Sequence, residues 1–365
     1  MRDICIFNGG VKNSGGIERV AANLANMWVA DGDKVTLVIS DSCTESFFKL
    51  DPNIKITSLG VDHNISVLRQ LGDFFRLIVK FRAYVKRKRP DVVMGMWTSR
   101  AMIATIACLG LGIPVIACEH SAYEKMRSDF KILRLFVYRL STAVVALTER
   151  DTDLYKKINA NSYTIPNAIK RIRYNERDDT NKTILWVGWI SYEKGVDRLL
   201  EIWSEICKKY PDWKLKIIGK IPDDKPEYGK ILDRMKNKYE FGGQLTIMAS
   251  TQEIFNEYDN ADIFVMTSRY EGLPMVLLEA MASGLPVICY DCPTGPREII
   301  EDRVNGFLIS DGDTKSFAEK LSLLIENNAL RKVYGKNAYD TVNRCFNEKI
   351  VSWKWDDLIA RCISR

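Results

Sequence analysis

The sequence has few histidines, no regular cysteine framework and no long uninterrupted apolar run. Among 365 residues, only His63 and His120 are histidines, and the nine cysteines include a single C-x-x-C pair, Cys289 and Cys292. Zinc sites built from cysteine and histidine normally need more ligands than this, so we expect no metal site. Scattered cysteines in an odd number are typical of ordinary thiols in a reducing cytosol.

The longest apolar run, residues 101–117, is too short and too interrupted to cross a membrane. It contains Gly110, Gly112 and Pro114, which favour a helix, a turn and a buried strand. The first residues lead directly into a strand pattern without the segments of a signal peptide. We therefore expect a cytoplasmic protein.

The net charge of +6 and the pI of about 8.7 are only mildly basic. They fit an anionic small ligand or an anionic membrane surface. No basic stripe interleaved with aromatic residues is present, so we expect no nucleic acid partner. The basic, amphipathic stretch over residues 74–89 could rest on the inner face of the plasma membrane as a peripheral contact. An ordinary surface helix with a solvated basic end is the alternative.

Strand and helix patterns alternate along the chain, and the alternation restarts in its middle. Short continuous apolar strands separated by helices are typical of parallel sheets covered on both faces. We expect strands over residues 4–7, 34–39, 91–96, 114–118, 143–147, 183–187, 215–218, 245–248, 263–266 and 286–290. We expect helices over residues 15–30, 67–87, 99–109, 130–140, 195–209, 228–239, 252–258, 274–283, 315–326, 329–342 and 348–359.

A polar, proline-containing stretch over residues 164–182 separates the two halves and is predicted to be a linker. The predicted fold class is α/β, with two doubly wound Rossmann-like domains facing a central cleft. We place the first domain at residues 1–165, the second at residues 166–346 and a C-terminal helix at residues 347–365. Ligands of such sheets lie at the carboxyl ends of the strands, so the loops after strands are the candidate sites.

Two glycine-containing loops follow the first strand of each half. The first loop carries Gly15 and Gly16 at the start of a helix, where backbone N–H groups can approach an anion. Its spacing is not G-x-G-x-x-G, although Asp41 after the second strand would suit a nicotinamide dinucleotide. The second loop contains Gly188 and Lys194, where a cation and free N–H groups can meet a phosphate. Ordinary solvated turns are the alternative for both loops.

A third loop follows another strand and holds two glutamates that are eight positions apart. Gly272 and Leu273 can offer N–H groups at the start of an apolar helix, whose dipole favours an anion, and Pro274 suits the first helical position. Glu279 lies about 7.5 Å further along the axis at 1.5 Å per residue. One elongated ligand with a central phosphate could therefore touch both Glu271 and Glu279. A structural glutamate bonded to nearby backbone is the alternative.

The order of these loops resembles that of the retaining glycosyltransferases of family 4, which have the two-domain B-type (GT-B) fold. The resemblance spans essentially the whole chain, and its short motifs each follow a strand. They are Gly15-Gly-Ile-Glu-Arg19, Glu119-His-Ser121, Ile165-Pro-Asn-Ala168, Val187-Gly-Trp-Ile-Ser-Tyr-Glu-Lys-Gly195, Glu271-Gly-Leu-Pro-Met-Val-Leu-Leu-Glu279 and Pro293-Thr-Gly-Pro-Arg-Glu-Ile-Ile300.

The resemblance implies a role for each site residue. Glu271 would hold hydroxyls of the donor sugar, and Glu279 would hold the ribose hydroxyls of the nucleotide. Lys194 would neutralise the diphosphate, and His120 would lie near the reacting sugar. These implications make Glu271, Lys194 and His120 the catalytic candidates. The further donor-site candidates are Gly15, Gly16, Gly188, Trp189, Gly272, Leu273, Met275 and Glu279.

Trp189 departs from the family pattern, which has an arginine right after the glycine of this motif. Losing that charge-assisted contact could cost roughly 1.5–3 kcal/mol. Arg297, Arg269 and Arg100 are the candidates to replace the missing charge. We expect no metal cofactor, because the D-x-D patterns over residues 31–33, 151–153 and 311–313 fall in turns or early in a helix.

The predicted reaction transfers a hexose or N-acetylhexosamine from a nucleotide sugar, preferably a UDP-sugar, to a glycan or lipid-linked glycan, with retention of configuration. The resemblance also implies that the C-terminal helix packs back onto the first domain. Two alternatives stay open. One is a non-catalytic nucleotide-sugar-binding subunit, suggested by Trp189, and the other is an NAD-dependent dehydrogenase, suggested by the first glycine loop and Asp41.

Overall fold

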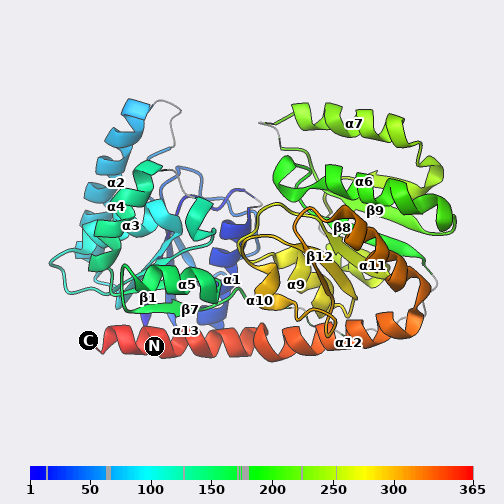
Figure 1. The fold of residues 1–365 in the computed structure, drawn as a ribbon. Coiled ribbons are helices and arrows are strands. Elements are labelled where there is room, and N and C mark those ends of the chain that lie inside the picture. The colour runs from blue at the N-terminus through cyan, green and yellow to red at the C-terminus, as the bar shows by residue number, and fades with distance from the viewer. Residues whose placement is uncertain are drawn as a thin grey trace. The chain divides into compact units, whose positions relative to one another are not determined.

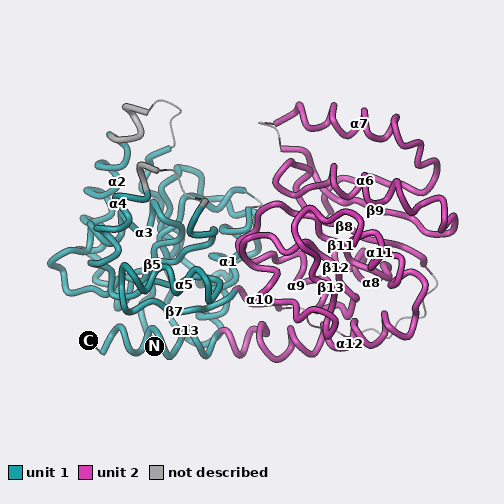
Figure 2. The backbone as a smooth tube through the Cα atoms, viewed as in Figure 1, with its two compact units in different colours: residues 1–166, 352–365 teal, residues 167–351 magenta. Residues whose placement is uncertain are grey.

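The computed structural model describes residues 1–13, 15–62, 67–125, 128–170, 172, 174, 181–222, 225–251 and 253–364. His63 and residues 171, 173 and 175–180 of the predicted linker lie outside these residues. The chain divides into two compact units, residues 1–166 with 352–365 and residues 167–351 (Figure 2). Each unit is built on one parallel sheet with helices packed on it (Figure 1), which confirms the predicted α/β class with two doubly wound sheets.

The first unit has a seven-stranded sheet in the order β3-β2-β1-β4-β5-β6-β7, with every neighbouring pair parallel. Its strands are β1 (Asp3–Asn8), β2 (Lys34–Ile39), β3 (Lys55–Ser58), β4 (Val92–Met96), β5 (Val115–Cys118), β6 (Ala143–Ala146) and β7 (Ser162–Thr164). Its helices are α1 (Gly16–Ala30), α2 (Val67–Lys88), α3 (Trp97–Cys108), α4 (Ser128–Val137) and α5 (Glu149–Lys156), joined by most of α13 (Glu348–Ile363).

Helix α3 is the central helix of the first unit and is buried on nearly all sides. It packs on β4 and β5 and is flanked by α2 and α4. Phe74 of α2 contacts the apolar clusters on both sides of α3. Phe74 therefore joins the two apolar clusters to which α3 contributes.

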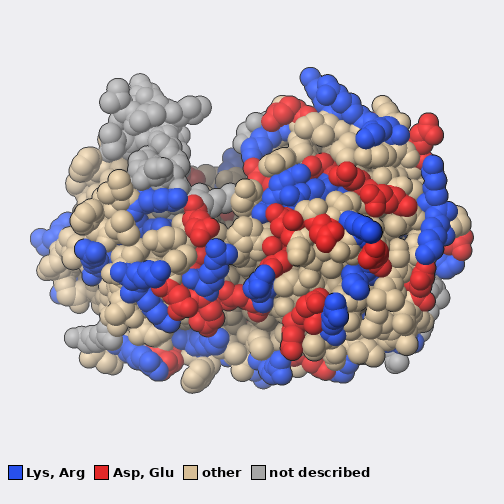
Figure 3. Space-filling view, in the orientation of Figure 1, with Lys and Arg blue, Asp and Glu red and all other residues tan. Residues whose placement is uncertain are grey.

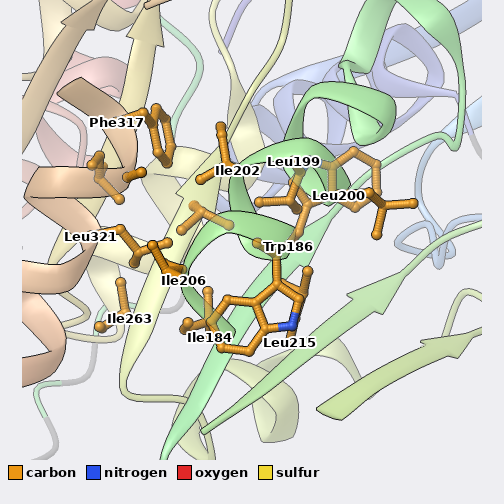
Figure 4. Packing of buried hydrophobic residues seen from close by; sticks show 14 of the residues in the cluster. Ile184, Trp186, Leu199, Leu200, Ile202, Ile206, Leu215, Ile263, Phe317 and Leu321 are labelled. Atoms are coloured by element: carbon orange, nitrogen blue, oxygen red, sulfur yellow. The ribbon is translucent and has the colours of Figure 1, made fainter. Parts of the chain in front are cut away.

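The second unit has a six-stranded parallel sheet in the order β10-β9-β8-β11-β12-β13. Its strands are β8 (Thr183–Val187), β9 (Lys214–Ile218), β10 (Leu245–Met248), β11 (Ile263–Met266), β12 (Val287–Asp291) and β13 (Phe307–Ser310). Its helices are α6 (Val196–Ile206), α7 (Glu227–Tyr239), α8 (Ile254–Asp259), α9 (Met275–Ala282), α10 (Pro296–Ile299), α11 (Thr314–Glu326) and α12 (Asn328–Cys345). Figure 4 shows its core, where Trp186 of β8 lies among aliphatic residues from α6, α11 and the neighbouring strands.

The C-terminal part of α13 packs against the first unit, which takes in residues from Ser352 onward. The rings of Trp28 and Trp355 meet edge to face with centroids 6.0 Å apart. Arg2 donates to Asp356 at 2.6 Å. An aromatic contact and a charge-assisted hydrogen bond thus hold the end of the chain on this unit.

Both sheets reverse their direction of winding beside their first strand. In the first unit the chain leaves β1 toward β2 and leaves β4 toward β5, although β1 and β4 are neighbours. In the second unit β8 and β11 are related in the same way. Such switch points leave a crevice at the carboxyl ends of the two strands, where doubly wound proteins bind ligands.

The predicted elements agree with the structure apart from short ones and boundaries. The predicted ranges omitted the edge strands β3, β7 and β13 and the short helices α5 and α10, although residues 151–153 were expected to lie early in a helix. Helix α9 begins at Met275, so Pro274 is its N-cap residue and not its first helical residue as predicted. The nine cysteines are free thiols. Within the described residues, no helix is both long enough and apolar enough to cross a bilayer.

Candidate active site

The candidate site of the second unit centres on an ion pair between Lys194 and Glu271. The Lys194 Nζ atom lies 2.7 Å from each carboxylate oxygen of Glu271, and Ser268 donates to one of these oxygens at 2.7 Å. The Glu271 side chain is only 6% exposed, whereas that of Lys194 is 28% exposed. The carboxylate is therefore fixed by charge and hydrogen bonding, and the ammonium keeps one side open to solvent.

Gly195 holds Lys194 in this position by a close backbone approach. Its φ is +67°, and a Cβ atom at this residue would lie 2.1 Å from the carbonyl oxygen of Thr267. The Thr267 hydroxyl donates to the Gly195 carbonyl at 2.8 Å. Only glycine combines this conformation with this contact, so the loops after β8 and β11 are locked together.

The Pro293-Thr-Gly-Pro296 stretch packs against the loop that precedes α9. The Thr294 hydroxyl donates to the Glu271 carbonyl. A Cβ atom on Gly295, whose φ is +94°, would lie 2.3 Å from the Gly272 carbonyl oxygen. Gly272 is partly exposed and Leu273 is 7% exposed at the start of α9. Contacts within the protein thus fix the backbone at the start of α9.

Glu279 is buried in α9 and has a protein partner that the sequence reading missed. Glu279 is only 2% exposed. The hydroxyl of Tyr258, a fully buried residue of α8, donates a hydrogen bond to the Glu279 Oε2 atom at 3.1 Å. A buried carboxylate without hydrogen bonds would be costly. Tyr258 therefore supplies part of the hydrogen bonding that a buried carboxylate needs.

The arginines considered as substitutes for a cation at position 189 are engaged elsewhere. Arg269 pairs with both carboxylate oxygens of Asp197 at 2.9 and 2.6 Å and stacks on the Tyr192 ring at 3.9 Å. Arg297 pairs with Asp291 and its side chain is 76% exposed. Trp189 itself is 45% exposed. In the described part of this unit, Lys194 is thus the cation that pairs with Glu271.

The glycine loop of the first unit lies against two charged side chains. A Cβ atom on Gly10 would lie 2.3 Å from an Asp41 carboxylate oxygen, and one on Gly9 would lie 3.5 Å from an Arg100 nitrogen. Arg100 is 5% exposed and donates to the Ser40 hydroxyl at 2.9 Å. Burial lowers the pKa of Arg100 to about 10, against the opposite influence of Asp41. Arg100 therefore belongs to the switch point of the first unit.

Gly15 and Gly16 stand at the start of α1 in different surroundings. Gly15 is the N-cap residue, and a Cβ atom there would meet the Glu18 carboxylate at 2.2 Å. A Cβ atom on Gly16 would meet nothing within 4 Å. The space beside Gly16 is consistent with the predicted approach of a ligand, but nothing in the fold itself requires glycine at that position.

His120 lies two residues after the end of β5, and both of its ring nitrogens are shielded from water. Neither nitrogen has a hydrogen-bond partner among the described residues. Burial lowers the pKa of His120 to about 4, so the imidazole is neutral at pH 7. The preceding Glu119 is buried, and it accepts hydrogen bonds from Thr98 at 2.8 Å and from Tyr138. Burial raises the pKa of Glu119, with these hydrogen bonds opposing the shift.

Sequence reasoning missed the residues that position the charged groups. Tyr258, Ser268, Asp197 and Thr294 each bond to a predicted site residue. Only Thr294 had a signal in the sequence, because it lies inside a motif that the sequence reading had already singled out. Ser268 lies three residues before Glu271 in the same loop, whereas Tyr258 and Asp197 come from other elements whose placement cannot be deduced from spacing.

Comparisons with known families cover both units. Residues 14–171 match the family model described as Glycosyltransferase Family 4, and residues 169–341 match the model described as Glycosyl transferases group 1. The two matches meet at the boundary between the units, so each unit corresponds to one family model.

Individual relatives match along the whole chain. The chain is 30% identical to the amylovoran biosynthesis glycosyltransferase AmsD of Erwinia amylovora, over 98% of this chain and 100% of that protein. It is 24% identical, over 95% of this chain and 96% of the other, to the Campylobacter jejuni GalNAc-alpha-(1->4)-GalNAc-alpha-(1->3)-diNAcBac-PP-undecaprenol alpha-1,4-N-acetyl-D-galactosaminyltransferase. The crystal structure of Anabaena Alr3699/HepE in complex with UDP superimposes with a TM-score of 0.82 at 16% identity, covering 98% of this chain and 100% of that one, which shows a common fold.

Proposed function

Because this chain belongs to the GT-B glycosyltransferases with Family 4 and group 1 domains, and is thus a hexosyltransferase, we propose that it uses a UDP-sugar. The transferred group is a hexose or N-acetylhexosamine, and the acceptor is a glycan or a lipid-linked glycan. Amylovoran synthesis and an undecaprenol-linked acceptor in the names of its relatives support this acceptor class, and the UDP complex of Anabaena HepE supports the nucleotide.

One observation carries the proposal: Lys194 contacts the loop that leads into α9, and Glu279 lies within the same helix. Lys194 contacts Glu271 just before the helix, and Glu279 lies one turn further in. A helix N-terminus favours a diphosphate. In our proposal Glu271 binds sugar hydroxyls, the helix tip and Lys194 bind the diphosphate, and Glu279 binds the ribose.

The main catalytic requirement of this reaction is stabilisation of the leaving diphosphate. Charge grows on that group as the glycosidic bond breaks, and fixed N–H groups with a nearby ammonium stabilise it without reorganisation. We propose that the reaction retains the anomeric configuration and needs no divalent metal. The neutral His120 would accept or donate a hydrogen bond at the reacting sugar. Trp189 leaves the diphosphate with fewer cations than an arginine would give.

Thermal-shift screening with UDP-, GDP- and ADP-sugars tests the nucleotide first. We expect a concentration-dependent rise in Tm with UDP-sugars, because ligands that bind only the folded state stabilise it. Sugar transfer is then measured with and without EDTA, using the donor that binds. UDP binding without turnover on any glycan or lipid-linked acceptor would favour a non-catalytic subunit, and binding of NAD but not UDP would favour a dehydrogenase.

We further propose that the outer faces of α2 and α4 rest on an anionic lipid surface. Phe75 and Val79 on α2 are 66% and 68% exposed, and Ile132 and Phe136 on α4 are 63% and 62% exposed. Each pair is four residues apart, so both members lie on one helix face. On the visible face of the first unit, Figure 3 shows charged side chains of both signs among uncharged surface.

The cations beside this apolar face favour a lipid surface as its occupant. The last turn of α2 contains Lys86, Arg87 and Lys88, and Arg139 follows α4. These cations form no ion pair with other described residues. Exposed apolar side chains flanked by unpaired cations are typical of helices that lie in the interface of anionic membranes.

Co-sedimentation with phosphatidylglycerol and phosphatidylcholine vesicles tests this contact on the full chain. We expect binding to the anionic vesicles that weakens with salt, and its loss in Phe75→Ser with Phe136→Ser. Val333→Ser on α12, where the valine is 54% exposed, is the matched control. Unchanged binding by the double variant, or a dimer that the same changes dissociate, would contradict the proposal.

A further inference from the structure

Trp97 is a strained, exposed tryptophan at the carboxyl end of β4. Its φ is +67°, a left-handed conformation that is a genuine outlier for a bulky side chain. The residue is 51% exposed. Its indole makes no ring contact and no hydrogen bond with any other described residue. The protein thus holds a large aromatic surface toward solvent in an unfavourable backbone conformation.

The fold requires this backbone conformation but not the indole. A Cβ atom on Gly95 would lie 2.4 Å from the Cα atom of Ala101, so α3 leaves β4 through a very tight turn. A positive φ at Trp97 makes that turn possible, as in other strand-to-helix turns that project a side chain above a sheet. Glycine or asparagine would adopt the same conformation at lower cost. Local packing therefore does not explain the tryptophan.

The surroundings of Trp97 are those of a ligand site. It lies at the switch point of the first unit, where β1 and β4 are neighbours. The next residue, Thr98, donates to both carboxylate oxygens of Glu119 at 2.8 Å. The residue after Glu119 is His120, whose ring nitrogens are buried without a partner among the described residues. The hydrogen bonds between Thr98 and Glu119 thus connect the residue after Trp97 with the residue before His120.

We propose that Trp97 stacks against a pyranose ring of the acceptor glycan and so selects a sugar as the acceptor. The C–H face of a pyranose is apolar and its rim is hydroxylated, which suits an aromatic face beside hydrogen-bonding groups. The residues argued to bind the nucleotide sugar, Lys194, Glu271 and Glu279, belong to the other unit. The inference rests on the proposed glycosyltransferase function, and it adds a named residue for the second substrate.

Two substitutions separate the effect of the Trp97 indole from the effect of the backbone conformation. Trp97→Asn removes the aromatic face and suits a positive φ, whereas Trp97→Phe retains an aromatic face. Trp353→Asn is the matched control, because Trp353 on α13 is 67% exposed and lies outside the switch point. The full chain is assayed with its donor at saturation and with octyl glycosides of hexoses and N-acetylhexosamines, in both anomers, as acceptors.

We expect Trp97→Asn to raise the KM for the best acceptor glycoside about tenfold. Trp97→Phe should show a smaller increase, and Trp353→Asn should match the native chain. Hydrolysis of the UDP-sugar by water, the UDP affinity and the Tm should not fall in Trp97→Asn. The acceptor should also change the tryptophan fluorescence of the native chain but not that of Trp97→Phe.

The outcomes separate this inference from the function on which it rests. A native chain that neither binds UDP nor transfers sugar contradicts the proposed function. A native chain that transfers sugar, with an acceptor KM unchanged in Trp97→Asn, contradicts only the role of Trp97. Equal losses in donor hydrolysis and in Tm would show that the indole is structural, and this also overturns the inference.

Discussion

The ammonium group of Lys194 lies 2.7 Å from both carboxylate oxygens of Glu271, although 77 positions separate the two residues. The two loops meet because Gly195 allows the backbone after β8 to touch the backbone after β11. The pair places a positive charge beside the start of α9 and a carboxylate next to it. Our account of the site depends on this relationship.

Replacing Lys194 with methionine should reduce kcat about 100- to 1,000-fold, which is the usual effect of removing one group that stabilises a developing negative charge. Methionine is nearly as long as lysine, but it removes the charge and the hydrogen-bond donors. Lys220→Met, at an exposed lysine in the same unit, serves as the control and should keep its activity. Unchanged sugar transfer in Lys194→Met would show that the leaving diphosphate is stabilised elsewhere.

Gly295→Ala should destabilise the second unit and weaken nucleotide binding together. The new Cβ atom would lie 2.3 Å from the Gly272 carbonyl oxygen, so the loop before α9 must shift. The left-handed conformation alone costs about 1–2 kcal/mol with a side chain. Gly312→Ala is the matched control, because Gly312 has φ +82° with nothing within 4 Å of its Cβ position.

Thermal denaturation and UDP titration of both alanine variants separate strain from contact. We expect similar backbone strain in each variant but a larger fall in Tm for Gly295→Ala, and a loss of UDP affinity only there. Equal UDP affinity in the two variants would mean that the position of the helix tip does not matter for the nucleotide.

His120 should make the folding stability fall below neutral pH. Its pKa is about 4 in the folded chain and about 6.5 when exposed, so the unfolded chain binds the extra proton between these values. Stability from this group is therefore complete above pH 6.5 and is lost as the pH falls toward 4. The loss amounts to about 3 kcal/mol over that window.

Urea denaturation of the native chain and of His120→Gln between pH 7 and pH 4 measures this effect. The difference in unfolding free energy between the two should shrink by that amount as the pH falls. Parallel curves for the two chains would mean that the imidazole is not held in its neutral form.

Tyr258 and Glu279 should be coupled in stability. Tyr258→Phe leaves a buried carboxylate oxygen without its donor, which costs about 1–3 kcal/mol. Glu279→Gln removes the charge, so adding Tyr258→Phe to it should cost less than Tyr258→Phe alone. A double-mutant cycle by urea denaturation gives the coupling energy, and additive effects would exclude a direct interaction.

Much of this fold follows from local sequence pattern. The central strands β1, β2, β8 and β11 are short, apolar and buried, and their pattern alone locates them within one or two residues. The edge strands β3, β7 and β13 were missed because a strand of three or four residues at a sheet edge is only partly covered and has no continuous apolar run.

The site was predictable in its chemistry but not in its contacts. Glycines and charges after strands pointed to Lys194, Glu271 and Glu279 as site residues, yet the sequence could not show that Lys194 bonds to Glu271. It also gave no sign of Tyr258 beside Glu279 or of Asp197 beside Arg269. Such pairs depend on where separate loops meet, which is a property of tertiary packing. The strained conformation of Trp97 likewise had no sequence signature.

The central claim is that one nucleotide sugar extends from Glu271 past the helix tip to Glu279. Calorimetric titration with uridine, UDP and the UDP-sugar tests it on three variants. Glu279→Gln should weaken the binding of all three ligands about tenfold. Lys194→Met should weaken the binding of UDP and the UDP-sugar but not that of uridine. Glu271→Gln should weaken only the binding of the UDP-sugar. If Glu271→Gln weakened uridine, or Glu279→Gln spared it, the proposed alignment of the ligand would be wrong.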